Sequence, residues 1–377
     1  MLFAFVPLLT LPQTAGAAAD QPVAVRAYQS FHLEVPYVPS IARIDGQDQL
    51  VYELHATNFS ARTLTIASID IVERNGARLA RVDPAATMRL VGARSDEAQR
   101  LAPGQRAIVY LSIPWTGGSA TLSHRIIFDA AREGAATDRV AIIGGHVTVA
   151  PPAPAELGAP LHGGPWTAVF LPDEDNGHRR FPYAVSGRVR LPGRHAIDWM
   201  PARGFDPRSA GTNVAADGSG ADVLAVADGE IVAVREPAAA SAPRSVEDET
   251  GAMIVLRLPD GRYAHYQHLE PGIAVRVGER VQRGQVIARV GSSGHVTQPH
   301  LHFHVADGIT PLDSEGLPYR LDAGRMVGRY STFEAFNEGQ AWQPAAARPV
   351  DGLPAANASS SSAAATPNRM AGKRSGG

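Results

Sequence analysis

The sequence predicts an all-β protein built from two successive β-rich parts and ending in a disordered tail. Three observations lead to this prediction. Short runs of β-branched and aromatic residues recur along the chain and are separated by Gly, Asn, Asp and Pro. A segment rich in Pro and Ala at residues 149–163 divides these runs into two groups. A segment rich in Ala and Ser follows the second group.

The first group of runs occupies residues 22–148. Strands at this spacing, without helical periodicity, are typical of an antiparallel β-sandwich, and we expect an immunoglobulin-like one. We find no cluster of catalytic side chains in this part of the sequence. We therefore interpret it as an accessory domain that spaces or docks the rest, with a partner that the sequence does not identify. The clearest runs are residues 50–56, 63–72, 107–113 and 140–149.

The second group of runs occupies residues 164–345, which we interpret as a second domain joined by a linker at residues 149–163. Its runs are separated by glycines, and Pro259-Asp260-Gly261 between two of them is a good turn sequence. Residues 346–377 contain too few apolar residues to fold and are predicted to be disordered. The expected strands are residues 223–235, 253–258, 262–268, 273–277, 286–290 and 301–305.

The composition fits a soluble globular protein and excludes several functions. The 377 residues are 44% hydrophobic and 19% charged, with a formal net charge of -2. Without a basic surplus, a nucleic acid or an anionic membrane is not an expected partner. The chain contains no cysteine. A disulfide framework, a thiolate metal site and a cysteine nucleophile are therefore excluded, and any metal must be bound by His, Asp or Glu.

Residues 1–20 have the pattern of an export signal peptide. An apolar run is followed by small residues with Ala-x-Ala patterns, although the usual Lys or Arg before the apolar run is missing. No later run approaches the roughly 20 apolar residues that a membrane-spanning helix needs. We therefore expect a soluble protein that is periplasmic or secreted.

Histidines are concentrated in one part of the second domain. Three of them alternate with apolar residues in the run His-Leu-His-Phe-His-Val at residues 300–305. On a strand this alternation places the three imidazoles on one face and the apolar side chains in the core. By the same rule Tyr266 and His268 are expected to share one face of their strand, with His265 on the other. Six of the 13 histidines lie within forty residues: His265, His268, His295, His300, His302 and His304.

Asp198 is a carboxylate within an apolar stretch, Ala-Ile-Asp-Trp. Burying an unpaired carboxylate costs several kcal/mol, so Asp198 is expected either to bind a metal or to pair with an arginine such as Arg194. Together with the histidines it offers an oxygen and several nitrogen ligands for zinc. A catalytic zinc site uses three protein ligands and leaves one position for water, whose pKa the metal lowers toward 7.

Five segments extend this pattern: residues 221–229, 266–269 (Tyr-Gln-His-Leu), 281–285, 291–294 (Gly-Ser-Ser-Gly) and 299–303 (Pro-His-Leu-His-Phe). Together they resemble the lysostaphin-type zinc metallopeptidases over roughly residues 170–310. The resemblance implies a small antiparallel, β-barrel-like peptidase domain with an open groove. It also implies a Zn²⁺ cofactor and hydrolysis of peptide bonds in peptidoglycan.

The resemblance further implies roles for individual residues. Asp198 and His302 would be zinc ligands. His268 and His300 would orient or deprotonate the attacking water and stabilise the oxyanion. The sequence departs from the usual family pattern in two places. His304 occupies a position where many relatives carry Glu, which is expected to affect the edge of the site rather than its ligands. The usual His-x-x-x-Asp pattern is absent, so the first ligand is ambiguous.

His178 and His195 compete to be the first ligand. If residues 194–199 form a strand, the odd spacing between His195 and Asp198 places the two side chains on opposite faces. His178 lies in a turn-like segment that can return to the site through a hairpin at residues 183–191. A similar His-Arg-Arg precedes Ala-Ile-Asp-Trp in a subset of relatives. We favour His178 and keep His195 as the alternative.

The sequence therefore predicts an exported zinc metalloendopeptidase, a murein hydrolase, in which His268 and His300 assist the zinc-activated water. The alternative is a non-catalytic cell-envelope protein that binds or regulates through the same groove. The presence of Asp198, His268, His300 and His302 favours the enzyme. The sequence does not indicate which peptide bond is cleaved.

Overall fold

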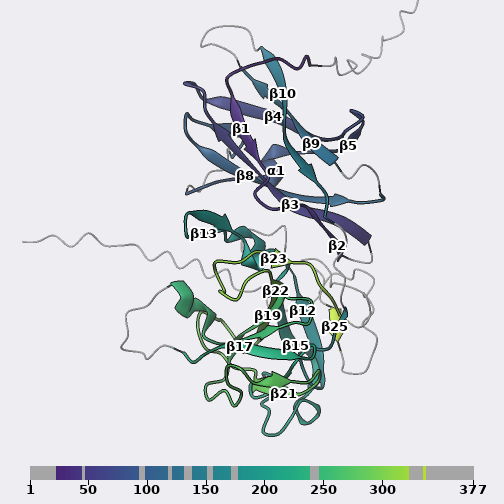
Figure 1. The fold of residues 1–377 in the computed structure, drawn as a ribbon, viewed down its shortest axis with the longest axis vertical. Coiled ribbons are helices and arrows are strands. Elements are labelled where there is room, and N and C mark those ends of the chain that lie inside the picture. The colour runs from purple at the N-terminus through teal and green to yellow at the C-terminus, as the bar shows by residue number, and fades with distance from the viewer. Residues whose placement is uncertain are drawn as a thin grey trace, which may run out of the picture.

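The computed structural model describes residues 23–44, 47–92, 98–117, 121–130, 138–150, 156–170, 177–237, 246–321 and 334–336. The predicted signal peptide (1–20), residues 151–155 of the predicted linker and the predicted tail (346–377) lie outside these residues. Almost all regular structure is β-strand, as Figure 1 shows, so the predicted all-β class is confirmed. No helix among the described residues is both long and apolar enough to cross a membrane.

Strands β1 to β10 form an antiparallel β-sandwich of two five-stranded sheets. In the first sheet the order is β1-β3-β8-β6, with β2 paired to β3; in the second it is β10-β9-β4-β5, with β7 paired to β4. A short helix, α1 (Pro84–Thr87), precedes β6. The strands are β1 (Phe31–Glu34), β2 (Ser40–Ile44), β3 (Gln47–Asn58), β4 (Leu64–Glu73), β5 (Arg78–Val82), β6 (Met88–Leu90), β7 (Arg100–Leu101), β8 (Arg106–Pro114), β9 (Thr121–Asp129) and β10 (Arg139–Thr148).

The sandwich has its own hydrophobic core between the two sheets. Leu54 of β3, Val109 of β8 and Phe128 of β9 are fully buried in it. All four strand runs that the sequence predicted in this part are strands, namely β3, β4, β8 and β10. Alternation decides which side chains face the core. Tyr52 faces inward, where its hydroxyl pairs with Nε2 of His124 at 2.9 Å, whereas its neighbour Glu53 does not belong to the core cluster.

The rest of the described chain is organised around one nine-stranded sheet, called here the large sheet. Its order is β20-β17-β18-β19-β22-β15-β12-β25, with β23 paired to β22. The strands are β12 (Gly164–Val169), β15 (Ile197–Asp206), β17 (Gly229–Arg235), β18 (Ala252–Arg257), β19 (Tyr263–Leu269), β20 (Arg280–Val281), β22 (Leu301–Ala306), β23 (Gly316–Leu317) and β25 (Glu334–Phe336).

Three two-stranded sheets and four 3-10 helices complete the described chain. The small sheets pair β11 with β24, β13 with β14 and β16 with β21. Their bounds are β11 (Glu156–Leu157), β13 (Tyr183–Val185), β14 (Arg188–Arg190), β16 (Asp222–Leu224), β21 (Val286–Arg289) and β24 (Arg320–Leu321), and the 3-10 helices are η1 (His178–Arg180), η2 (Pro192–His195), η3 (Pro207–Ser209) and η4 (Val246–Thr250).

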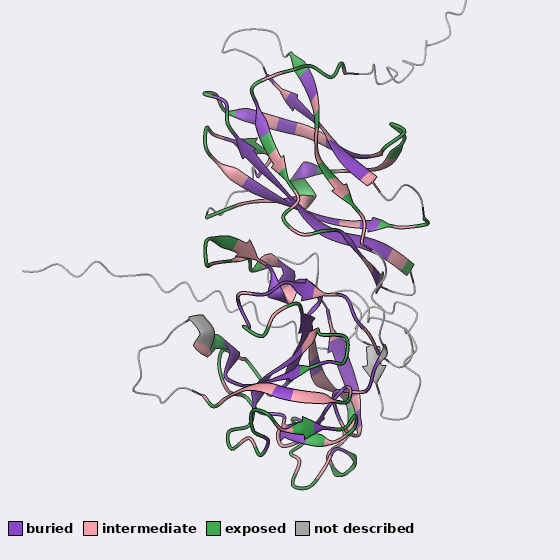
Figure 2. Ribbon diagram, viewed as in Figure 1, coloured by how far each residue is buried: buried purple, intermediate pink, exposed green. Residues whose placement is uncertain are grey.

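Strand β22 lies near the middle of the large sheet, hydrogen-bonded to β19 on one side and β15 on the other. Its apolar residues Leu301, Phe303 and Val305 are fully buried in the second hydrophobic core, as the alternating pattern predicted. Figure 2 shows this concentration of buried residues along the central strands. The described strands of the large sheet run from β20 to β25 and form an open sheet rather than a closed barrel.

Two strand predictions in this part are wrong in detail. Residues 223–235 do not form one strand: β16 ends at Leu224 and β17 begins at Gly229. The two strands join different sheets, so the chain must bend between them. Residues 273–277 contain no strand, although they are rich in β-branched residues. Val277 is 62% exposed, so its apolar side chain contributes little to a core.

Candidate metal centre

Three separate elements bring His178, Asp198 and His302 together. Asp198 on β15 and His302 on β22 are directly opposed across an antiparallel strand pair. Opposed residues project from the same face of a sheet, so their side chains meet. His178 is the first residue of η1 and approaches from outside the sheet. One ligand-type atom of each residue lies within 4.8 Å of those of the other two.

The distances between the three side chains fit a shared cation. Nδ1 of His302 lies 3.0 Å from Oδ1 of Asp198 and 3.1 Å from Nε2 of His178. The same Nε2 of His178 lies 3.3 Å from Oδ2 of Asp198. Ligand atoms around a tetrahedral zinc ion, at about 2.0–2.1 Å from the metal, are about 3.3 Å apart. The donor types and their spacing therefore suit Zn²⁺.

The electrostatics keep these groups in the form that binds a metal. Burial raises the pKa of Asp198, but the imidazoles of His178, His302 and His300 outweigh it and hold this pKa well below its usual range. Burial lowers the pKa of His178 to about 4. At neutral pH Asp198 is therefore a carboxylate and His178 a neutral imidazole with a free lone pair. Metal binding requires these forms.

Two further imidazoles border the three. The ring of His268 lies 4.8 Å from the ring of His300 and 5.8 Å from that of His302, measured between centroids. Nδ1 of His268 donates to the Ser293 carbonyl at 2.9 Å, and Nδ1 of His300 donates to the Gln298 carbonyl at 2.9 Å. Since a carbonyl only accepts, each Nδ1 carries the proton, and each neutral ring keeps its lone pair on Nε2.

His268 reaches the site only because the strand is irregular. Opposite Met253, β19 contains the two residues Gln267 and His268, which is a β-bulge, and φ of His268 is 64°. Tyr266 lies in the core, where its hydroxyl accepts from the Val226 amide at 3.0 Å. The expectation that Tyr266 and His268 share one face is therefore wrong. The bulge turns His268 away from the core and toward His300.

Two glycines of the 291–294 segment permit the close packing beside His268. A Cβ on Gly291 would lie 2.5 Å from the Glu270 amide nitrogen, and one on Gly294 would lie 2.4 Å from the Glu249 carbonyl oxygen. Gly294 also has φ of 83°, a conformation that favours glycine. The same segment contains Ser293, whose carbonyl accepts a hydrogen bond from Nδ1 of His268 and so keeps the proton on that nitrogen.

His195 does not join the three donors. Arg194 and His195 lie in η2, and β15 begins only at Ile197, so the expected strand over residues 194–199 is wrong. The opposite-face argument against His195 therefore does not apply, because a turn separates it from Asp198. His195 is fully buried, and both ring nitrogens lack a hydrogen-bond partner among the described residues. The pairing of Asp198 with Arg194 is also wrong, because Arg194 pairs with Glu53 and Glu315.

His304 contacts the candidate ligand His302 directly. Nδ1 of His304 lies 3.1 Å from Nε2 of His302, and both rings are buried. When Nδ1 of His302 faces a metal, its Nε2 carries the proton and donates to His304. His304, which was expected to affect the edge of the site, therefore lies directly against a candidate ligand. The ring of His304 also stacks on that of His265 at 4.6 Å. Both contacts follow from the alternation along β22 and its pairing with β19.

Part of the chain matches a known protein family. Residues 208–314 match Peptidase family M23. The chain therefore carries a peptidase M23 domain, and its predicted resemblance to the lysostaphin-type peptidases is confirmed. The matched residues include His268, His300 and His302, whereas His178 and Asp198 precede them.

Particular relatives match over short segments. The peptidoglycan DD-endopeptidase ShyB of Vibrio cholerae is 35% identical over 95 residues, which are 25% of this chain and 20% of the relative. The cell division protein DipM of Caulobacter vibrioides is 28% identical over 144 residues, 37% of this chain and 21% of the relative. The matches thus span about a fifth of the length of each relative.

Solved structures also resemble parts of the chain. The catalytic domain of the antimicrobial peptidase lysostaphin from Staphylococcus simulans is 22% identical, with a TM-score of 0.24 over 43% of this chain and 87% of that chain. A zinc-containing peptidase from Vibrio cholerae is 18% identical, with a TM-score of 0.26 over 73% of this chain and 82% of that chain.

Proposed function

We propose that this protein is an exported zinc metalloendopeptidase that hydrolyses peptide bonds in peptidoglycan. The observation that carries the proposal is the convergence of His178, Asp198 and His302 on one point beside His268 and His300. The peptidase M23 domain supports peptide hydrolysis. The name of the V. cholerae relative, a peptidoglycan endopeptidase, supports the substrate class.

The proposal divides the chain by function. Residues 1–20 direct export to the periplasm or the medium. Residues 22–148 form the accessory β-sandwich, 149–163 link it to the peptidase domain at 164–345, and 346–377 form the tail. Leu157 and Leu161 pack into the core beneath the large sheet, so the second half of the linker is anchored to the peptidase domain.

In the proposed mechanism His178, Asp198 and His302 hold Zn²⁺. A zinc ion bound there lowers the pKa of a water molecule and polarises the scissile carbonyl. His268 and His300 each present an Nε2 lone pair toward the site, so one can accept the proton of the attacking water and later return it to the leaving amine. Burial lowers the pKa of His268 to about 3, so its Nε2 is unprotonated at neutral pH but is a weaker base than that of an ordinary imidazole. Once it has accepted the proton, His268 or His300 can donate to the oxyanion.

Zinc content and muropeptide release test the proposal together. We expect the purified full-length protein to bind about one zinc ion and to release cleaved stem or bridge peptides from sacculi, and we expect a chelator to abolish the release. His32→Ala is the control and should keep both zinc and muropeptide release, because His32 is an exposed histidine of the sandwich. Full hydrolysis by metal-free protein would refute the zinc mechanism. Zinc-dependent binding to sacculi without any cleavage would favour the alternative of a non-catalytic envelope protein.

A further inference from the structure

We propose that the β-sandwich helps to form the metal site without supplying a ligand. Glu53 of the sandwich positions the candidate ligand His178 through the neighbouring Arg179. The inference rests on the proposed zinc site and goes beyond it, since it assigns a task to the sandwich. The observations that carry it are a buried ion-pair network between the two parts of the chain and the place of Arg179 in the sequence.

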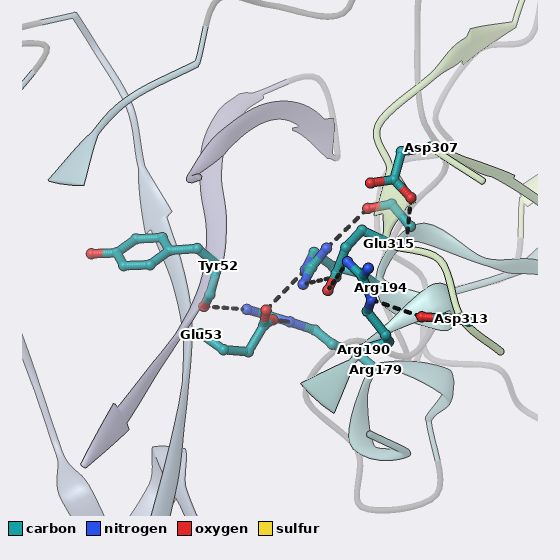
Figure 3. Close-up of polar contacts among 9 residues, drawn as sticks. Tyr52, Glu53, Arg179, Arg190, Arg194, Asp307, Asp313 and Glu315 are labelled. Atoms are coloured by element: carbon teal, nitrogen blue, oxygen red, sulfur yellow. Dashed lines mark hydrogen bonds and ion pairs between the residues drawn. The ribbon is translucent and has the colours of Figure 1, made fainter. Parts of the chain in front are cut away.

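Arg179 directly follows His178 and is anchored in the sandwich. Its guanidinium donates to Oε1 of Glu53 at 2.7 Å and to Oγ of Ser112 at 2.8 Å. It also donates to the carbonyls of Tyr52 at 2.7 Å and Leu111 at 2.8 Å. All four acceptors belong to β3 and β8, and the Arg179 side chain is fully buried. Figure 3 shows the guanidinium of Arg179 reaching toward Glu53 and the Tyr52 carbonyl.

Glu53 also binds a second arginine, Arg194, at the other end of the segment from η1 to η2. Its Oε2 accepts from Nε of Arg194 at 2.9 Å. Arg194 also donates to Oε2 of Glu315 at 2.8 Å and to the Gly316 carbonyl at 3.1 Å. The buried network of Glu53, Glu315, Arg179 and Arg194 is therefore balanced in charge. Such a network is stable only when every member keeps its partners.

Apolar and aromatic contacts add to this junction. The guanidinium carbon of Arg180 lies 4.1 Å from the ring centroid of Tyr110, which opposes Glu53 across β3 and β8. Leu191 packs against Ile108 and Tyr110. The segment from η1 to η2 thus rests on the outer face of one sandwich sheet, as Figure 1 shows for the hairpin of β13 and β14.

This segment begins at one candidate ligand and ends three residues before another. Arg179 follows His178, and η2, which ends at His195, precedes Asp198. The backbone of Gly193 lies against His178, since a Cβ there would be 2.8 Å from the His178 carbonyl oxygen. Asp198 and His302 are fixed by the pairing of β15 with β22, but His178 lies on a three-residue helix. The four hydrogen bonds of Arg179 anchor that helix to the sandwich, so the sandwich sets the position of the His178 imidazole.

The test compares zinc affinity in two sandwich variants of the full-length protein. Glu53→Gln removes the carboxylate that pairs both arginines. Asp70→Asn is the matched control: Asp70 is also buried and paired with two arginines, Arg81 at 2.6 Å and Arg125 at 3.6 Å, but within the sandwich. Both changes destabilise the sandwich, so a purely structural role of Glu53 predicts the same zinc affinity in both variants.

We expect Glu53→Gln to lower zinc affinity by about 10–100-fold, the range seen when groups that orient metal ligands are removed. Asp70→Asn should retain the wild-type affinity. Affinity is measured by competition with a chelator at a temperature where circular dichroism shows both variants folded. The visible spectrum of the Co²⁺-substituted protein gives a second readout, which should change in Glu53→Gln alone.

Wild-type affinity and an unchanged Co²⁺ spectrum in Glu53→Gln would overturn the inference and leave the proposed function intact. Failure of the wild-type protein to bind zinc would overturn both. If Glu53→Gln does not fold, Ser112→Ala removes one of the four hydrogen bonds of Arg179 and should give a smaller decrease in zinc affinity. Unchanged zinc affinity in Ser112→Ala would then refute the positioning role.

Discussion

Replacing His178 by alanine should weaken zinc binding far more than replacing His195. His178→Ala removes one of three converging donor atoms. Four-ligand zinc sites in peptides bind with about 10–16 kcal/mol, so one ligand contributes about 3 kcal/mol and its loss lowers affinity roughly 10²-fold. His195 lies outside the group of donors, so its removal should leave zinc affinity unchanged.

His195→Ala is a demanding control because the side chain is fully buried. Its removal leaves a cavity that costs about 1–3 kcal/mol of stability, partly offset by the loss of two unpaired buried nitrogens. The assay therefore pairs a chelator competition titration with thermal unfolding of both metal-free variants. Loss of zinc in His195→Ala together with retention in His178→Ala would refute the ligand set and place the nearer histidine at the metal.

Other predictions concern proton transfer, ligand orientation and acid stability. His268→Ala and His300→Ala should each keep zinc, measured by metal analysis, but lose about 10²–10⁴-fold in muropeptide release; loss of metal in either would contradict its role. His304→Ala should lower zinc affinity by about 10–100-fold through its bond to His302, and an unchanged chelator titration would show that this bond does not matter. Burial lowers the pKa of His124 to about 4 from an ordinary 6.5. As the pH falls, His124 is therefore protonated in the unfolded chain before it is protonated in the folded protein. The free energy of unfolding is highest above pH 6.5 and falls by up to about 3 kcal/mol as the pH drops through 4. His124→Phe should reduce this fall in urea unfolding at pH 7 and pH 4.5, and an equal fall in both proteins would contradict the assignment.

The sequence predicted those parts of the structure that depend on strict alternation. Residues 301–305 show this best, because each apolar side chain is in the core and the intervening imidazole faces the site. The position of His268 could not be predicted in this way. A bulge shifts the register by one residue, and it depends on the pairing of β19 with β18 rather than on local sequence. The strand predicted at residues 273–277 is absent for a related reason, since β-branched residues form a strand only where a partner strand is present.

One signal in the sequence pointed to the junction between the two parts. Glu53 interrupts the apolar run of residues 50–56 just as Asp198 interrupts Ala-Ile-Asp-Trp. Both carboxylates are largely or fully buried, and the pKa of each is lowered. The pKa of Glu53 is about 2, because Arg194 and Arg179 outweigh the effect of burial. The rule that a buried carboxylate needs a partner applied equally to both. The identity of the partners could not follow from it, because Arg179 and Arg194 are more than a hundred residues away from Glu53.

The pairing of β15 with β22 has a consequence for how quickly metal enters and leaves. Asp198 and His302 lie on adjacent inner strands of the large sheet, so the ladder between the two strands holds their backbones in place. His178 lies on a short helical turn outside the sheet and is the most exposed of the three donors. We therefore expect that release and uptake of a zinc ion would begin with detachment of His178, while Asp198 and His302 would keep their positions. Stopped-flow chelation should then show a dissociation rate that rises when the anchor of η1 is weakened and that is unaffected by changes in the opposite sheet of the sandwich.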